Sequence, residues 1–135
     1  MNLILAILRT VPLFQSLTEE QHETIMEHIT MEYYPAGYKL FEKGVTGDAM
    51  YIIKTGGVKI HNGEQELANL GEGQFFGEMS LIEDQPRMAS AVTLSDCEIF
   101  VLKRDDFSEL MQNSPDIASS VKEAYKARKA QNASN

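Results

Sequence analysis

The sequence has little that would support secretion, membrane insertion or nucleic-acid binding. Its single cysteine, Cys97, excludes a disulfide within the chain, which is typical of a reducing compartment. The apolar start over residues 1–8 is far shorter than the roughly 20 residues of a membrane span, and no basic residue precedes it. The 12 Lys and Arg are outnumbered by 20 Asp and Glu, whereas a nucleic-acid surface is basic. We expect a cytoplasmic protein that by itself binds neither nucleic acid nor membranes, with residues 1–8 as an amphipathic helix.

The residue combinations of common enzymes are also missing. Metal sites need clustered histidines and carboxylates, but His22, His28 and His61 lie apart and form no His-x-His pair. No serine occupies a Gly-x-Ser-x-Gly turn, and no Walker-type phosphate loop is present. Cys97 has no evident histidine partner and reads as a strand residue. These absences predict a protein that is not an enzyme, with no metal and no cofactor.

What is present has the size and composition of one globular domain. The chain has 135 residues, of which 43% are hydrophobic and 24% charged. We predict a single domain over 1–135, with an N-terminal helical segment over 1–30, a β unit over 31–103 and C-terminal helices over 104–130.

Local signals support the helices at both ends. Thr18 and Gln21 have the spacing of a capping box, and apolar residues follow at helical intervals, which predicts a helix over 18–29. Ser114-Pro115 is typical of a helix start and predicts a last helix over about 115–130.

Between the helices, short β-prone runs alternate with glycines, which favours a sandwich or barrel of short strands. Asn62-Gly63 predicts a tight hairpin turn with positive φ at both positions. The candidate strands are residues 38–41, 49–53, 58–60, 66–70, 90–93 and 99–102.

One segment, residues 71–92, breaks the alternation and carries the chemistry. Gly77 precedes a short helix former, so we expect the unpaired backbone N–H groups of residues 78–80 to converge on an anion. Arg87 lies just beyond the helix end and could fold back onto the same anion, from a pocket rather than the core. Glu78 fits if the ligand presents a sugar hydroxyl. The alternative is that Glu78 only complements the helix dipole and Arg87 is a solvated turn residue.

The run from Phe76 to Ile82, followed by Pro86-Arg87-Met88-Ala89-Ser90, resembles the phosphate-binding cassette of cyclic nucleotide-binding domains. That family includes protein kinase A regulatory subunits, cyclic-nucleotide-gated channels and catabolite activator protein. The glycine pattern over 35–58 and the entry at 11–18 are similar to the family's as well. The resemblance covers about residues 9–128. It implies a mainly β fold, a jelly-roll-like β-roll with N-terminal helices, a cassette helix and C-terminal lid helices.

The resemblance implies that ligand contacts come from a cassette over 76–90. Gly77 would allow the backbone to approach a cyclic phosphate, Glu78 would accept from the ribose 2′-OH, and Arg87 would pair with the exocyclic phosphate oxygens. Amides near positions 79–80 and 88–89 would line the site. The implied ligand-binding residues are Phe76, Gly77, Glu78, Met79, Ser80, Arg87, Met88 and Ala89.

The resemblance also implies a ligand and a mode of regulation. A threonine after the arginine often favours cGMP in the family; this chain has Met88 there, so we favour cAMP over cGMP. The C-terminal helix would close as a lid, with Tyr125 and Arg128 as candidate caps over the purine. Ligand binding would then control a partner protein or a fused effector domain. The alternative is a degenerate β-roll that binds no ligand and serves as a protein–protein interaction module.

Overall fold

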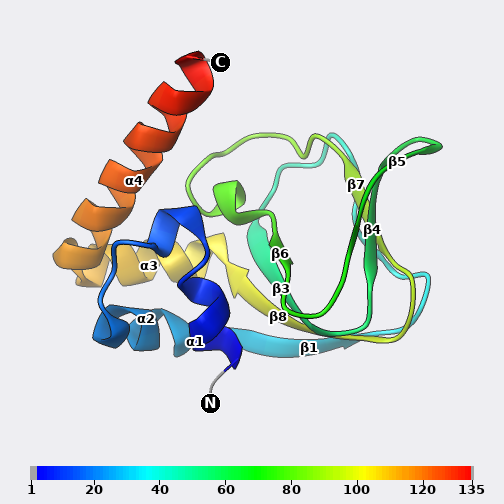
Figure 1. Cartoon of the computed structure of the whole chain (residues 1–135), viewed down its shortest axis with the longest axis horizontal. Coiled ribbons are helices and arrows are strands. Elements are labelled where there is room, and N and C mark those ends of the chain that lie inside the picture. The colour runs from blue at the N-terminus through cyan, green and yellow to red at the C-terminus, as the bar shows by residue number, and fades with distance from the viewer. Residues whose placement is uncertain (1–2, 135) are drawn as a thin grey trace. The chain divides into compact units, whose positions relative to one another are not determined.

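The computed structural model describes residues 3–134, with side chains described as far as residue 130. Contacts within the chain divide it into two compact units, residues 1–28 with 105–135 and residues 29–104. The first, the helical unit, contains both chain ends, and the second, the β unit, contains all the strands of the part of the chain that the structure describes (Figure 1). The predicted single domain over 1–135 stays a prediction.

Five elements form the helical unit within residues 3–134. They are α1 (Leu3–Leu8), the 3₁₀ turn η1 (Pro12–Phe14), α2 (Glu19–Met26), α3 (Arg104–Asn113) and α4 (Pro115–Ser134). The predicted capping box is confirmed. The Gln21 backbone N–H donates to Thr18 Oγ1 at 3.1 Å, and the Thr18 N–H donates to Gln21 Oε1 at 2.9 Å.

Aromatic and aliphatic side chains far apart in the sequence meet in the core of the helical unit. The rings of Phe14 and Phe107 lie 5.6 Å apart between centroids. His22 is only 2% exposed, and its Nε2 lies 2.7 Å from the Phe14 carbonyl oxygen. Because that oxygen only accepts, Nε2 carries the proton and donates. Ile117 and Val121 bury one face of α4, which contacts η1.

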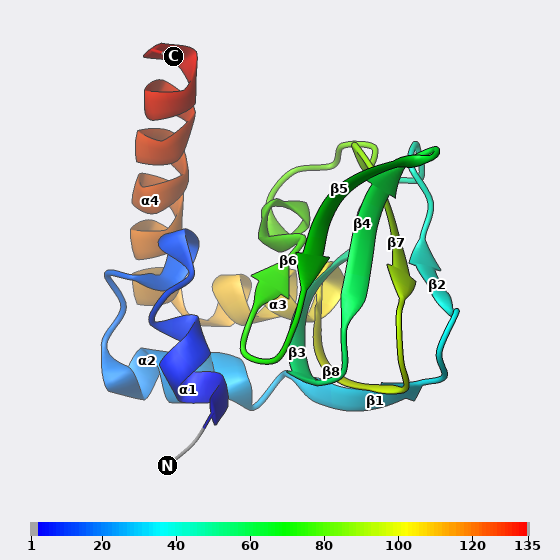
Figure 2. The ribbon, with the colours of Figure 1, turned by 45° about the vertical axis from the view of Figure 1, so that its right-hand side comes forward.

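The β unit consists of two four-stranded antiparallel sheets, in the orders β1-β8-β3-β6 and β2-β7-β4-β5. Figure 2 shows β5, β4, β7 and β2 as one layer. This is the predicted β-roll. The strands are β1 (Thr30–Tyr34), β2 (Lys39–Phe41), β3 (Ala49–Thr55), β4 (Val58–Asn62), β5 (Gln65–Leu70), β6 (Phe75–Phe76), β7 (Ser90–Thr93) and β8 (Cys97–Lys103).

Strands β3 and β8 supply most of the core of this unit. In β8 the odd-numbered residues Cys97, Ile99 and Val101 are buried, as the two-residue repeat of a strand requires. β3 is buried over its first five residues, so it reads as a continuous apolar run rather than an alternation. Cys97 is thus a buried strand residue, as predicted.

Two strands and one turn differ from the sequence prediction. β1 and β6 were not among the candidate strands, because β1 is mostly exposed and β6 has only two residues. The predicted turn at Asn62-Gly63 is wrong by one residue. Asn62 pairs with Gln65, so Gly63 and Glu64 form the loop, and only Gly63 takes a positive φ, of 61°.

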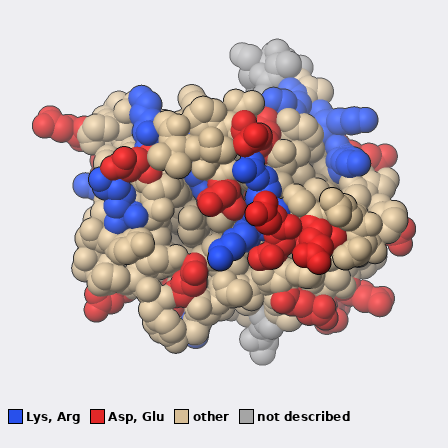
Figure 3. Space-filling view, turned by 180° about the vertical axis from the view of Figure 1, so that it is seen from behind, with Lys and Arg blue, Asp and Glu red and all other residues tan. Residues whose placement is uncertain are grey.

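Charged side chains of both signs occur on the face shown in Figure 3, where acidic side chains are spread widely and Lys and Arg lie between them. Within residues 3–134 no helix is long and apolar enough to cross a membrane. In that same range no three His, Cys, Asp or Glu side chains gather where they could hold a metal ion.

Candidate functional site

The predicted cassette is a tight turn that leads from β6 into a single 3₁₀ turn, η2 (Glu78–Leu81). Gly77 begins this turn with φ of 80°, a left-handed conformation that strongly favours glycine. The prediction that the amides of residues 78–80 are all unpaired is wrong for Ser80, whose N–H donates to the Gly77 carbonyl at 3.1 Å. A 3₁₀ turn pairs its third residue with the residue before the turn, so fewer amides remain for an anion.

The segment that carries Arg87 is held by backbone hydrogen bonds to the loop before β3. The Arg87 N–H donates to the Val45 carbonyl at 2.7 Å, and the Arg87 carbonyl accepts from the Gly44 N–H at 2.9 Å. The Gly47 N–H donates to the Gln85 carbonyl at 3.1 Å. These bonds fix the backbone position of Arg87 across about 40 residues of sequence.

The Arg87 side chain folds into the β unit and is only 8% exposed. Its guanidinium carbon lies 4.0 Å from the centroid of the Phe41 ring, within cation–π distance. Its Nη2 donates to the Ala49 carbonyl at 2.8 Å, while its buried Nε has no hydrogen-bond partner. Arg87 is therefore not a solvated turn residue. One of its hydrogen-bond donors, Nε, is buried without a partner.

Burial dominates the electrostatics around Arg87. Desolvation lowers the pKa of the Arg87 guanidinium, and the neighbouring Tyr51 and Asp48 act in the opposite direction. Desolvation likewise raises the pKa of Tyr51, and the positive charge of Arg87 opposes it. An arginine stays protonated in proteins even under such conditions. The β unit thus holds a buried positive charge whose attraction for an anion is weakly screened by water.

Two glycines make room for the guanidinium. A Cβ on Gly77 would lie 2.6 Å from Arg87 Nη1 and 3.0 Å from the Ala49 carbonyl oxygen. A Cβ on Gly47 would overlap Ser80 Oγ and would lie 2.9 Å from Arg87 Nε. Any side chain at either position would displace the arginine or the cassette turn.

Sequence reasoning missed four residues that shape this site, and each contacts or crowds Arg87: Phe41, Gly47, Ala49 and Tyr51. Gly47 entered the prediction only as part of a glycine pattern. The sequence carries little sign of these contacts because the four residues lie 36 to 46 positions before Arg87. Only the pairing of the two segments places them beside its side chain.

The other predicted ligand-binding residues fall into two groups. Glu78, Met79, Ser80 and Ala89 are half-buried around the turn. Phe76 is buried and stacks on Tyr51, with ring centroids 5.1 Å apart, so it serves the core. The Met88 side chain is 86% exposed. Tyr125 and Arg128 lie on α4 of the helical unit. The roles of all these residues toward a ligand stay predictions.

Comparison with known proteins identifies relatives that cover most of the chain. Residues 31–114 match the family profile described as "Cyclic nucleotide-binding domain". The chain is 38% identical over 112 residues to the "Cyclic AMP receptor protein" of Thermus thermophilus, covering 79% of this chain and 52% of that protein. It is 35% identical over 114 residues to a "cAMP-dependent protein kinase regulatory subunit" of Aspergillus fumigatus, covering 83% of this chain and 28% of that protein. The chain thus spans about half or less of these relatives.

Solved structures share the fold. The N-terminal domain of a transcriptional regulator from Streptomyces coelicolor superposes with a TM-score of 0.83 at 27% identity, covering 93% of this chain and 94% of that one. The regulatory domain of Toxoplasma gondii PKA, crystallised with cAMP, gives a TM-score of 0.70 at 30% identity and covers 79% of this chain and 42% of that one.

Proposed function

We propose that this chain, which belongs to the cyclic nucleotide-binding domain family, binds cAMP through Arg87 and the turn that begins at Gly77. The observation that supports this most is the buried guanidinium of Arg87, which keeps an unpartnered Nε beside two glycines. Burying a charge with an open donor costs free energy, and an anionic ligand would offset that cost. The function would be regulatory rather than catalytic.

Each part of the nucleotide has a proposed contact. Arg87 would pair with the exocyclic phosphate oxygens, because a guanidinium offers two parallel donors to a phosphate. Gly77 would let the backbone approach the cyclic phosphate, and Glu78 would accept from the ribose 2′-OH. The amides near Met79, Ser80, Met88 and Ala89 would line the site, although the Ser80 amide would first have to release the Gly77 carbonyl.

One observation favours cAMP over cGMP. Met88 follows the arginine, and its thioether side chain cannot bond the guanine amino group as a hydroxyl would.

The proposed output is a population shift in which α4 acts as a lid and changes the surface offered to a partner protein or a fused effector domain. Tyr125 continues the face of α4 that buries Ile117 and Val121, at intervals of four residues, and is itself half-buried. Tyr125 and Arg128 would cap the purine in the closed state.

Thermal melting tests the ligand directly. We expect cAMP at about 100 times its Kd to raise the free energy of unfolding by roughly 2.7 kcal/mol. For a chain of this size the melting temperature should rise on the order of 10 °C. cGMP at the same concentration should give a smaller rise, and 5′-AMP, which lacks the cyclic phosphate, should give almost none. If none of the three nucleotides shifts the midpoint, the chain is instead a degenerate β-roll that serves as an interaction module.

The lid has its own test. We expect Tyr125→Ala to weaken cAMP binding by roughly fivefold, because the purine would lose one aromatic contact worth about 1 kcal/mol. Isothermal titration calorimetry measures the affinity. Lys126→Ala, an exposed neighbour on the same helix, is the matched control and should bind normally. Equal affinities for the two variants would remove Tyr125 from the site.

A further inference from the structure

A concave site lies in the β unit, well away from the cassette. We name it the Tyr33 pocket; it has a volume of about 400 Å³. β3 runs from Ala49, which holds Arg87, to Thr55, which lines this pocket. At about 3.3 Å per strand residue the two ends of β3 are roughly 20 Å apart. The lining residues are Tyr33, Tyr34, Pro35, Thr55, Asp96, Cys97 and Glu98.

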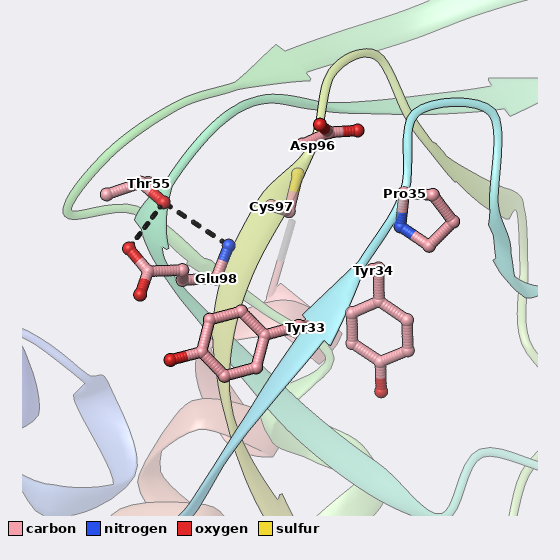
Figure 4. Close-up of a pocket in the computed structure, with 7 residues that line it drawn as sticks. All are labelled: Tyr33, Tyr34, Pro35, Thr55, Asp96, Cys97 and Glu98. Carbon is pink, nitrogen blue, oxygen red and sulfur yellow. Dashed lines mark hydrogen bonds between the residues drawn. The ribbon is translucent and has the colours of Figure 1, made fainter.

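The sheet register groups the lining side chains. Tyr33 pairs with Glu98 across β1 and β8, and Thr55 pairs with the same Glu98 across β3. Directly paired residues project from the same face of a sheet, so these three side chains form one row. Figure 4 shows Tyr33, Glu98 and Thr55 on one side of the strands, and Asp96 at the turn before β8. The row combines an aromatic ring with a carboxylate.

The pocket is negatively charged and aromatic. Asp96 and Glu98 line it, and its lining includes no lysine or arginine. Among the side chains that the structure describes, the cation paired with either carboxylate is Lys54, whose Nζ lies 3.8 Å from Glu98 Oε2. Tyr33 is 69% exposed, so the face of its ring is accessible to a ligand. Burial and the Glu32 carboxylate raise the pKa of Tyr34, which stays a neutral phenol and donates to Glu32 at 2.7 Å.

Hydrogen bonds hold the pocket in shape without a ligand. Asp96 Oδ1 accepts from the Ala36 N–H at 2.9 Å, and Glu98 Oε1 accepts from Thr55 Oγ1 at 3.0 Å. Gly56 has φ of 97°, and a Cβ there would lie 2.6 Å from Cys97 Sγ and 2.7 Å from the Asp96 carbonyl oxygen. A site whose walls are already fixed loses less entropy when it binds a ligand.

We propose that the Tyr33 pocket is a docking site for an arginine side chain of a partner protein. The guanidinium would stack on the Tyr33 ring and pair with Asp96 and Glu98, since a planar cation satisfies ring and carboxylate together. Its methylene stem would cover Pro35. A lysine fits less well because its compact ammonium is more strongly hydrated and cannot stack. Charge complementarity therefore selects the occupant, and this site is separate from the one proposed for cAMP.

The test uses the 135-residue chain, labelled with ¹⁵N, and nuclear magnetic resonance. The probe is the capped peptide Ser-Gly-Arg-Gly-Ser. In the control peptide citrulline replaces arginine, which keeps the shape of the side chain and removes its charge. We expect saturable shifts with the arginine peptide at the amides of Tyr33, Ala36, Thr55 and residues 96–98. The citrulline peptide should cause almost none. Equal shifts with both peptides would overturn the proposal.

Variants tie the binding to the pocket. Tyr33→Ala and Asp96→Asn should each lower the affinity for the arginine peptide by roughly fivefold or more, because the first removes the aromatic ring and the second removes one negative charge. Asparagine keeps the oxygen that accepts from Ala36, so Asp96→Asn should fold normally. Glu66→Gln, an exposed acid on β5 of the other sheet, is the control and should bind like the parent chain. All variants should keep the parent melting temperature and its response to cAMP.

Two further outcomes would overturn the proposal. Peptide binding unchanged in Tyr33→Ala and Asp96→Asn would mean that the peptide binds elsewhere. Shifts at the same amides that depend on protein concentration, with no peptide present, would make a second copy of this chain the occupant instead of a different partner.

Discussion

Arg87→Ala is expected to abolish the rise in melting temperature that cAMP causes. The variant loses the only side chain proposed to pair with the phosphate, and charged hydrogen bonds of this kind are worth about 1.5–3 kcal/mol each. Two such bonds would account for a loss of affinity of a hundredfold or more, on the order of 3 kcal/mol. Melting curves with and without cAMP, and calorimetric titration, measure the effect.

The same substitution is expected to reduce the stability of the unliganded chain only modestly. The variant loses the hydrogen bond from Arg87 to the Ala49 carbonyl, at 2.8 Å, and the contacts of the guanidinium with the Phe41 and Tyr51 rings. Together these are worth about 1–2 kcal/mol. Removing a buried, incompletely paired charge offsets part of that cost.

Two variants make the Arg87 result specific. Arg87→Lys keeps the charge but not the fork, so we expect cAMP affinity between that of the parent chain and that of Arg87→Ala. Arg9→Ala removes an exposed arginine that pairs with Glu19 at 3.4 Å in the helical unit, and should leave affinity unchanged. A normal cAMP response in Arg87→Ala would exclude Arg87 as the phosphate ligand.

Gly77→Ala is expected to impair both stability and ligand binding. Alanine at φ of 80° costs about 1–2 kcal/mol, and its Cβ would also press on Arg87 Nη1 and the Ala49 carbonyl oxygen. Overpacking adds about 1–3 kcal/mol, so the free energy of unfolding should fall by about 3 kcal/mol. Because the displaced group is the proposed phosphate ligand, cAMP affinity should fall with it. Chemical denaturation and calorimetry measure the two effects.

Gly73→Ala separates backbone strain from displacement of Arg87. Gly73 has φ of 82°, almost the same as Gly77, but a Cβ there meets nothing within 4 Å. We expect this control to lose about 1–2 kcal/mol of stability and to bind cAMP normally. If both variants lose equal stability and keep equal affinity, crowding at Gly77 plays no part in the site.

Features governed by neighbouring residues were predictable. Thr18 and Gln21 form the capping box because all four groups involved lie within one helical turn. The start of α4 at Pro115 follows from the fixed φ of proline, which suits a first helical position. The turn at Gly77 and the short helix after it were predictable in the same way, since the glycine and the residues that follow it are contiguous in the sequence.

Features governed by strand pairing were less predictable. Asn62-Gly63 favours a hairpin by local propensity, yet the pairing of Asn62 with Gln65 moved the turn to Gly63 and Glu64. β6, with two residues, is a strand only because Tyr51 and Ile52 of β3 pair with it. Such registers depend on the whole sheet, because a slip of one residue would turn every side chain to the opposite face.

Some properties of Arg87 could be predicted from the sequence, and others depend on the tertiary structure. The identity of Arg87 and its place after a short helix could be read from the chain, and so could its suitability for a phosphate. The burial of Arg87 could not be read from the sequence. Phe41, Gly47 and Ala49 lie next to its side chain because backbone hydrogen bonds join residues 44–47 to residues 85–87. Local sequence acts over a few residues, whereas the surroundings of a buried charge are assembled from segments that meet only when the sheets form.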